Sequence, residues 1–159
     1  KQSDAGIMPQ HLDFYNATVR ENITMFNHFD SREEKMTELL ERFELTHFKP
    51  DDYITSAEHL SLGEKKRMHL IRMSIENKDT WIVDEPTASL NVRLRDKIWQ
   101  EIFSKNTVIA ATHDLSHLEQ FDYVHYLENG EIIESNKVAE ALMDNGPVSE
   151  AYKRYHDQL

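Results

Sequence analysis

Residues 80–86 read Thr-Trp-Ile-Val-Asp-Glu-Pro, and residues 107–114 read Thr-Val-Ile-Ala-Ala-Thr-His-Asp. Each begins with a short apolar run, which is typical of parallel strands buried on both faces. A helix is predicted between them, over about residues 92–103, so this segment forms a βαβ unit. Another short strand is predicted near Ile7. We therefore expect an α/β protein with a mostly parallel sheet.

The sequence on either side of this unit predicts a helical insert and a hairpin. The segments expected to be helical before Thr80 are about residues 17–23, 31–43 and 60–77. Ser31 and Glu34 are spaced as a capping box for the second of them. After the unit, Asn129-Gly130 is a tight hairpin signal, and helices are expected from there to the end. The predicted division is 1–12 as the sheet edge, 13–78 as a helical subdomain, and 79–159 as the remaining α/β core.

The composition argues against nucleic acid as a direct partner. The chain of 159 residues carries 18 Lys and Arg against 29 Asp and Glu, a formal charge of −11, which repels a phosphate backbone. It contains no cysteine, so disulfides and thiolate metal sites are excluded. No apolar run approaches the roughly 20 residues that cross a bilayer.

Asp84 and Glu85 follow a predicted buried strand. The carboxyl ends of parallel strands form the edge at which open α/β sheets bind ligands. One carboxylate there can hold Mg²⁺ while the other orients or deprotonates an attacking water, as phosphoryl transfer requires. An Asp-Glu pair after a strand is also commonly a solvated loop or a helix cap, and the pair alone does not decide between these explanations.

His113 follows the next strand at the same predicted edge and could hydrogen-bond a terminal phosphate or the attacking water. Gln10, after the first strand, could contact a metal or a water through its amide. His113 and His117 lie four residues apart on what is expected to begin a helix, a spacing that can bind a metal. No third ligand is near in sequence, so a metal role for this pair is not favoured.

Ser61 and Gly63 open the predicted helix at residues 60–77. A helix N-terminus with a hydroxyl and a glycine is suited to binding an anion. Three cations at residues 65–67 crowd its first turn, where the helix dipole disfavours positive charge. The alternative is that Ser61 only caps the helix, with Glu64 completing a capping box. The local sequence favours neither explanation.

Taken together, these motifs resemble the ATP-binding cassette (ABC) ATPases over nearly the whole chain. The family's motifs occur in its order: a Q-loop at residues 8–10, a signature motif at 60–67, Walker B at 82–86, a D-loop at 88–91 and a switch histidine at 112–114. Residues 16–23 are similar to the segment that follows the Q-loop in ABC exporters. The resemblance implies a P-loop NTPase-like (RecA-like) sheet with an inserted α-helical subdomain.

The resemblance also implies roles for individual residues. Glu85 would be the catalytic carboxylate, Asp84 would organise Mg²⁺, and His113 would sense the γ-phosphate. Gln10 would act in catalysis, contact the metal and couple it to a transmembrane domain. The cofactors implied are ATP and Mg²⁺.

The signature motif is implied to serve a different nucleotide. Domains of this family pair head to tail, so each signature contacts the ATP of a second nucleotide-binding domain. The residues implied to contact that ATP are Ser61, Leu62, Gly63, Glu64 and Asn91. The implied partners are this second domain and a transmembrane domain of a transporter, which would place the chain at the cytoplasmic side of a membrane.

The sequence departs from the family pattern in ways that affect function. No Gly-x-x-x-x-Gly-Lys-Ser/Thr segment occurs among the residues of the chain, and its start is expected to fall within a fold. Leu62 replaces a signature glycine, and Asn91 replaces the usual D-loop aspartate. The chain alone is therefore expected neither to bind ATP tightly nor to hydrolyse it.

Two functions from different classes remain. The first is the ATPase subunit of an ABC exporter, favoured by Glu85 and His113. The second is a non-hydrolysing regulatory module that contributes its signature to a partner's ATP site, favoured by Leu62 and Asn91. A soluble ABC protein outside transport is disfavoured by the exporter-like segment at residues 16–23.

Overall fold

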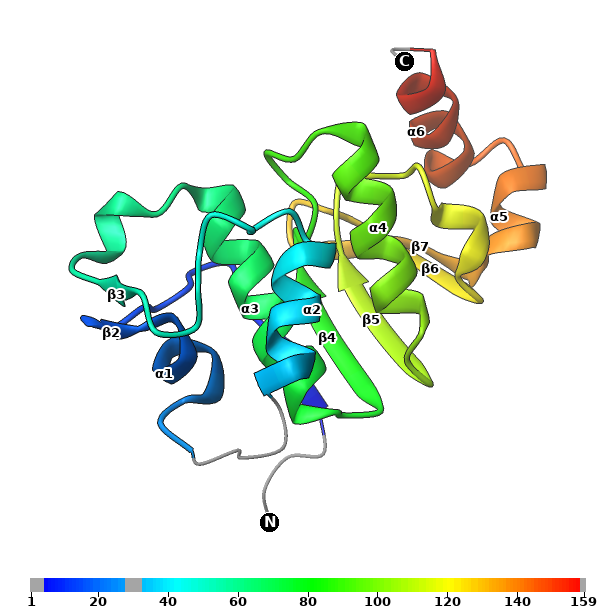
Figure 1. The fold of residues 1–159 in the computed structure, drawn as a ribbon. Helices are drawn as coiled ribbons and strands as arrows, with labels where there is room; N and C mark the ends of the chain where they lie inside the picture. The colour runs from blue at the N-terminus through cyan, green and yellow to red at the C-terminus, as the bar shows by residue number, and fades with distance from the viewer. Residues whose placement is uncertain (1–4, 28–32, 158–159) are drawn as a thin grey trace. The chain divides into compact units, whose positions relative to one another are not determined.

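The computed structural model describes residues 5–27 and 33–157, which form two compact units that divide after Thr112 (Figure 1). The first unit contains a three-stranded sheet, made of β1 (Ala5–Met8), β4 (Thr80–Asp84) and β5 (Thr107–Ala111). The strand order is β1-β4-β5, and both pairings are parallel. Helix α4 (Val92–Phe103) connects β4 to β5, so the predicted βαβ unit and the α/β class are confirmed.

One face of this sheet is buried and the other is not. Trp81 and Val83 are 0% and 1% exposed, whereas Ile82, which lies between them, is 37% exposed. Ile7 and Ile109 are the register partners of Ile82 and are 51% and 58% exposed. The prediction that both faces are buried is therefore wrong for the described part of the chain. Alternate side chains point to opposite faces, and the described helices cover only one face.

The buried face of the sheet packs against α3 (Leu62–Glu76). A Cβ on Gly6 would lie 3.2 Å from the Met73 side chain of this helix and 3.3 Å from Trp81. Helix α3 is the predicted signature helix, and Asn77 ends it in a left-handed conformation with φ 53°. The predicted helix therefore has nearly the expected bounds.

The described part of the first unit contains five further elements. They are β2 (Ala17–Thr18), α1 (Val19–Thr24), α2 (Glu33–Arg42), β3 (Tyr53–Ile54) and the 3-10 helix η1 (Ala57–His59). Thr18 and Glu21 form a capping box at the start of α1. The short antiparallel pair β2–β3 adds strand structure to the segment predicted as helical. The capping box predicted for Ser31 lies outside the described residues.

The second unit contains a hairpin and two helices. Its elements are the 3-10 helix η2 (Leu118–Gln120), β6 (Tyr123–Glu128), β7 (Glu131–Lys137), α5 (Val138–Met143) and α6 (Pro147–His156). Asn129 and Gly130 have φ 50° and 82°, which is the geometry of the predicted hairpin turn. Leu118, Val138, Ala141 and Val148 form its buried core.

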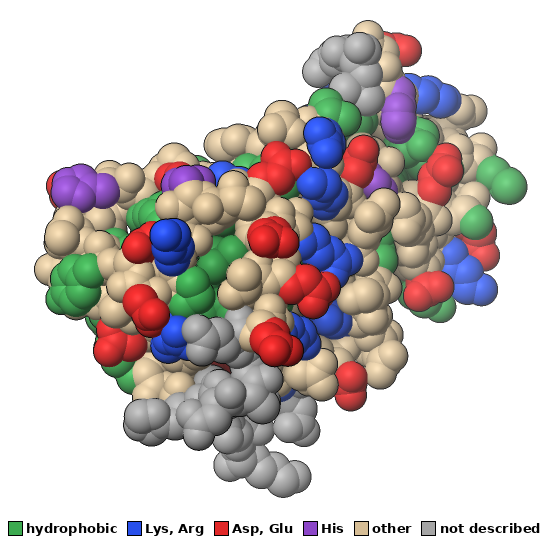
Figure 2. Space-filling view, in the orientation of Figure 1, with side chains coloured by type: hydrophobic (Ala, Val, Ile, Leu, Met, Phe, Trp, Pro, Cys, Tyr) green, Lys and Arg blue, Asp and Glu red, His purple; other side chains and the backbone are tan. Residues whose placement is uncertain are grey.

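Charged side chains of both signs alternate over α2 and α4. Figure 2 shows Lys and Arg side chains interleaved with Asp and Glu side chains on this face. Arg42 lies 2.8 Å from Glu101, and Lys97 lies 2.7 Å from Glu44. This face is therefore a mixed-charge surface rather than a basic patch. No helix in the described ranges is long and apolar enough to cross a membrane.

Candidate functional site

Asp84 and Glu85 lie where β4 leaves the sheet. Asp84 is the last residue of the strand. The backbone N–H of Glu85 still donates to the carbonyl of Ala111 on β5, at 2.8 Å. Glu85 has φ 47°, an uncommon conformation for a residue with a side chain, which turns the chain out of the sheet. The turn ends at Asn91, whose side chain accepts from the backbone N–H of Leu94 at 2.9 Å and caps α4.

Gln10 lies at the same edge of the sheet as Asp84. Met8, the last residue of β1, is the register partner of Val83 in β4, so the two strands end side by side. Gln10 follows two residues later and is exposed. A carboxylate and an amide oxygen form a donor set that suits Mg²⁺, which usually keeps several waters and takes one or two protein oxygens.

Ser61 and Glu64 form a complete capping box at the start of α3. The Ser61 hydroxyl donates to the Glu64 carboxylate at 2.8 Å and accepts from the Glu64 backbone N–H at 3.2 Å. The Ser61 backbone N–H donates to the same carboxylate at 2.8 Å. Ser61 therefore caps α3 in the folded chain. Any anion that binds at this helix start must compete with Glu64 for the Ser61 hydroxyl.

His47 also contacts the Glu64 carboxylate, with 2.8 Å between its Nε2 and Oε1 of Glu64. Burial raises the pKa of Glu64, but the hydrogen bonds from Ser61 and His47 outweigh it, and the pKa lies below its ordinary value. Glu64 therefore carries a negative charge at neutral pH. Leu62, beside it, is 49% exposed and leaves the helix start open to solvent.

The start of α3 packs against the turn at residues 85–90. A Cβ on Gly63 would lie 3.1 Å from Cδ2 of Leu90, so the glycine allows a close approach of the two segments. Nζ of Lys66 donates to the carbonyls of Glu85 and Ala88. The fold thus brings together two predicted motifs of one chain, the signature and the turn that follows Walker B.

His113 opens the second unit. The sequence predicts a helix from this residue, but the structure has only the short 3-10 helix η2, which begins at Leu118. Asp114 instead accepts from the backbone N–H of Ser116 at 3.1 Å and from the hydroxyl of Tyr155 at 2.7 Å. The helical spacing expected for His113 and His117 is therefore absent. Among the described residues, no group of three or more His, Cys, Asp or Glu side chains could hold a metal.

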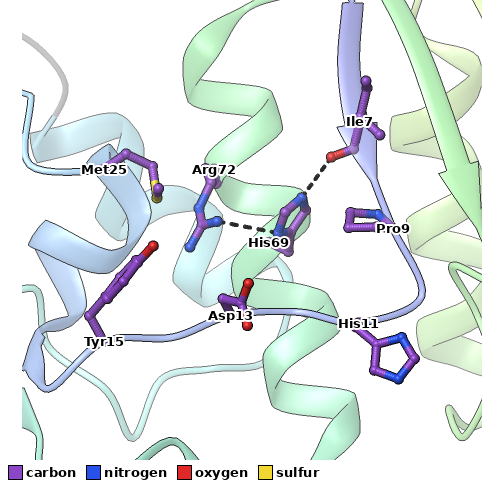
Figure 3. A pocket seen from close by; sticks show the side chains of 8 residues that line it. All are labelled: Ile7, Pro9, His11, Asp13, Tyr15, Met25, His69 and Arg72. Carbon is purple, nitrogen blue, oxygen red and sulfur yellow. Dashed lines mark hydrogen bonds between the residues drawn. The ribbon is translucent and has the colours of Figure 1, made fainter.

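A groove of about 290 Å³ lies between the segment after β1 and helices α1 and α3. Figure 3 shows Arg72 and His69 of α3 on one side of it and Tyr15 and Met25 on the other. Arg72 is 8% exposed, and its Nε donates to the carbonyl of Asn22 at 3.1 Å. Its Nη2 has no hydrogen-bond partner within the described ranges.

His69 is held in one neutral form at the floor of this groove. Its Nε2 lies 2.9 Å from the carbonyl of Ile7. A carbonyl only accepts, so Nε2 carries the proton and Nδ1 can accept from Arg72 at 3.5 Å. Burial lowers the pKa of His69 to about 4. Sequence reasoning missed His69 and Arg72; the available signal was two polar residues beside the apolar stripe of α3.

Asp84 and Glu85 lie at the carboxyl end of β4, which is the edge at which open α/β sheets bind ligands. The ABC transporter family model matches residues 1–88. The chain therefore belongs to the ABC transporter family, and it corresponds to the family's ATP-binding domain.

Several relatives match most of this chain. The glutathione/L-cysteine transport system ATP-binding/permease protein CydC of Escherichia coli (strain K12) is 29% identical over 148 residues, covering 88% of this chain and 26% of CydC. Leptomycin B resistance protein pmd1 of Schizosaccharomyces pombe (strain 972 / ATCC 24843) is 29% identical over 151 residues, covering 88% of this chain and 11% of pmd1. The chain thus spans about a quarter of CydC and less of pmd1.

A solved structure shares the fold. A bacterial Atm1-family ABC exporter with ATP bound matches with a TM-score of 0.82 and 24% identity. The match covers 95% of this chain and 28% of the exporter chain. The predicted family and fold class are therefore confirmed.

Proposed function

We propose that this chain is the ATP-hydrolysing part of an ABC exporter subunit. The observation that carries the proposal is the edge of the sheet. There Asp84 ends β4 and Glu85 follows it, beside the end of β1, which Gln10 follows two residues later. Family membership supports ATP as the nucleotide. CydC is by name both an ATP-binding and a permease protein, which supports a function in transport.

In the proposed reaction, Asp84 and Gln10 hold Mg²⁺ directly or through water. When bound, the ion would neutralise part of the negative charge on the phosphates. Glu85 accepts a hydrogen bond from the attacking water, orients it toward the terminal phosphate and takes up its proton. His113 follows the end of β5 by two residues, and we propose from this place in the chain that it hydrogen-bonds the terminal phosphate.

The signature end of α3 is proposed to contact ATP held by a second nucleotide-binding domain. The backbone N–H groups at the start of α3 and the Ser61 hydroxyl are the donors available for a phosphate. The Glu64 carboxylate lies 2.8 Å from that hydroxyl and must turn away when a phosphate binds. Leu62 and Asn91 complete this proposed surface.

The groove beside His69 is proposed to receive a segment of a transmembrane domain. Tyr15 and Met25 are 47% and 37% exposed at its rim and offer apolar surface. The buried Nη2 of Arg72 can donate to a carbonyl or a carboxylate of that segment. The groove thus combines an apolar rim with one buried donor.

The alternative is a non-hydrolysing module that contributes only its signature motif. The observation that favours it is the departure at Leu62 and Asn91 from the residues that the family resemblance implies. This alternative keeps the pairing with a second domain but assigns no chemistry to Glu85.

The test is the substitution Glu85→Gln in the complete protein, compared with Glu131→Gln on exposed strand β7. Gln keeps the shape but cannot accept a proton, so Mg²⁺-dependent ATP hydrolysis should fall by about 100-fold or more. Binding of labelled ATP should persist. Hydrolysis that survives Glu85→Gln would contradict the role proposed for Glu85. Hydrolysis that is absent from the wild-type protein would support the non-hydrolysing alternative.

A further inference from the structure

Lys66 is a cation buried near the N-terminal end of α3. It is 4% exposed, and the helix dipole disfavours a positive charge at this end. Burying an ammonium group is unfavourable unless acceptors surround it. Burial lowers the pKa of Lys66, and the nearby charges of Glu85 and Asp84 oppose this effect. The negative charges that offset the burial of the Lys66 ammonium therefore belong to Asp84 and Glu85, which are the residues proposed for catalysis.

The Lys66 ammonium donates to two backbone carbonyls of the turn at residues 85–90. It contacts the carbonyl of Glu85 directly and lies 3.5 Å from the carbonyl of Ala88. This turn contains two non-glycine residues with positive φ, Glu85 at 47° and Ser89 at 70°. Such conformations persist where the surrounding structure holds them. Lys66 supplies part of that support.

A second contact joins α3 to the same turn. Gly63 approaches Leu90 so closely that an added Cβ would lie 3.1 Å from it. The start of α3 thus contacts the turn at both of its ends. Lys66 donates a hydrogen bond at Glu85, and Gly63 packs against Leu90.

We propose that Lys66 is a positioning residue for ATP hydrolysis, which holds the turn so that Glu85 faces the substrate and ties this turn to the signature helix of the same chain. The inference rests on the proposed function. Because Ser61 is proposed to contact a second domain's ATP, Lys66 would connect that contact to this chain's own Glu85.

The first test measures hydrogen–deuterium exchange of the turn in the complete protein without nucleotide. Lys66→Met removes the donor at similar length, Lys66→Arg keeps a buried donor, and Lys97→Met is the control because Lys97 pairs with Glu44 at the surface. Amides of Ala88 and Leu90 are hydrogen-bonded within the turn. Their exchange should become about tenfold faster in Lys66→Met only, as expected for the loss of a charge-assisted hydrogen bond.

The second test measures ATP hydrolysis in the same proteins. The kcat of Lys66→Met should fall about tenfold or more with KM for ATP within about twofold, since a misplaced Glu85 affects the chemical step. Lys66→Arg should restore most of the rate. Lys66→Gln is a second neutral variant if Lys66→Met does not fold.

Unchanged exchange in the neutral variants overturns the inference. Faster exchange with an unchanged kcat also overturns it, because the turn would then not limit catalysis. A wild-type protein without ATP hydrolysis overturns the proposed function instead, and the exchange measurement still decides whether Lys66 holds the turn.

Discussion

Two polar residues of α3, His69 and Arg72, are buried and donate hydrogen bonds to backbone carbonyls far away in the sequence. His69 donates to the carbonyl of Ile7 from α3, and Arg72 donates to the carbonyl of Asn22. The sequence could not predict these bonds, because the partners lie 62 and 50 residues away along the chain. The capping box of Ser61 and Glu64 was predictable, because its partners lie within one helical turn.

We expect His69 to make the fold less stable at acidic pH. The folded imidazole has a pKa of about 4, against 6.5 ordinarily. As the pH falls through about 6.5, the unfolded chain binds a proton that the folded chain does not bind until about pH 4, so the free energy of unfolding decreases over this range. Between pH 7 and pH 5 the loss from this residue should be about 2 kcal/mol.

The measurement is urea unfolding at both pH values, followed by fluorescence of the buried Trp81 and Trp99. His69→Gln keeps an amide donor for Ile7 but does not titrate, so its loss between the two pH values should be smaller than that of the wild type. The exposed His125→Gln is the control. An equal loss in wild type and His69→Gln would show that the folded imidazole binds a proton as readily as the unfolded one, so that its pKa is not lowered.

At the scale of elements, α3 carries the signature motif at its start and the buried Lys66, His69 and Arg72 further along. Its bounds and the spacing of its capping residues, Ser61 and Glu64, followed from local patterns in the sequence. The helix expected from His113 was wrong because Asp114 instead bonds to Tyr155, 41 residues further along the chain. Distant contacts of this kind are not visible in local sequence patterns.

We expect Ser61 to stabilise α3 even without nucleotide. Ser61→Ala removes the hydroxyl that accepts from the Glu64 backbone and should lower the free energy of unfolding by about 1 kcal/mol. Thermal or urea unfolding measures this loss, and Ser135→Ala at an exposed position of β7 is the matched control. If Ser61→Ala is as stable as the control, the capping box contributes nothing and the hydroxyl serves only a ligand.

At the scale of the whole molecule, the predicted sheet, hairpin and terminal helices are all present, but one expectation about the sheet failed. Ile7, Ile82 and Ile109 lie in one row across it and are exposed. Continuous apolar runs predict burial on both faces, and the sequence contains no sign that the described helices would cover only one. The division into residues 1–12, 13–78 and 79–159 stays a prediction.

The central claim is that each ATP is served by Glu85 of one chain and by the signature of another. It is tested by ATP hydrolysis of dimers that contain two differently tagged copies of the complete protein. One substitution is Glu85→Gln; the other is Ser61→Asp, which can still cap α3 but repels a phosphate. If each ATP lies between Glu85 of one chain and Ser61 of the other, splitting the two substitutions between the copies leaves one site intact and about half the activity. Placing both substitutions in one copy then abolishes the activity. The reverse pattern would contradict the account, because Glu85 and Ser61 would then serve the same ATP within one chain.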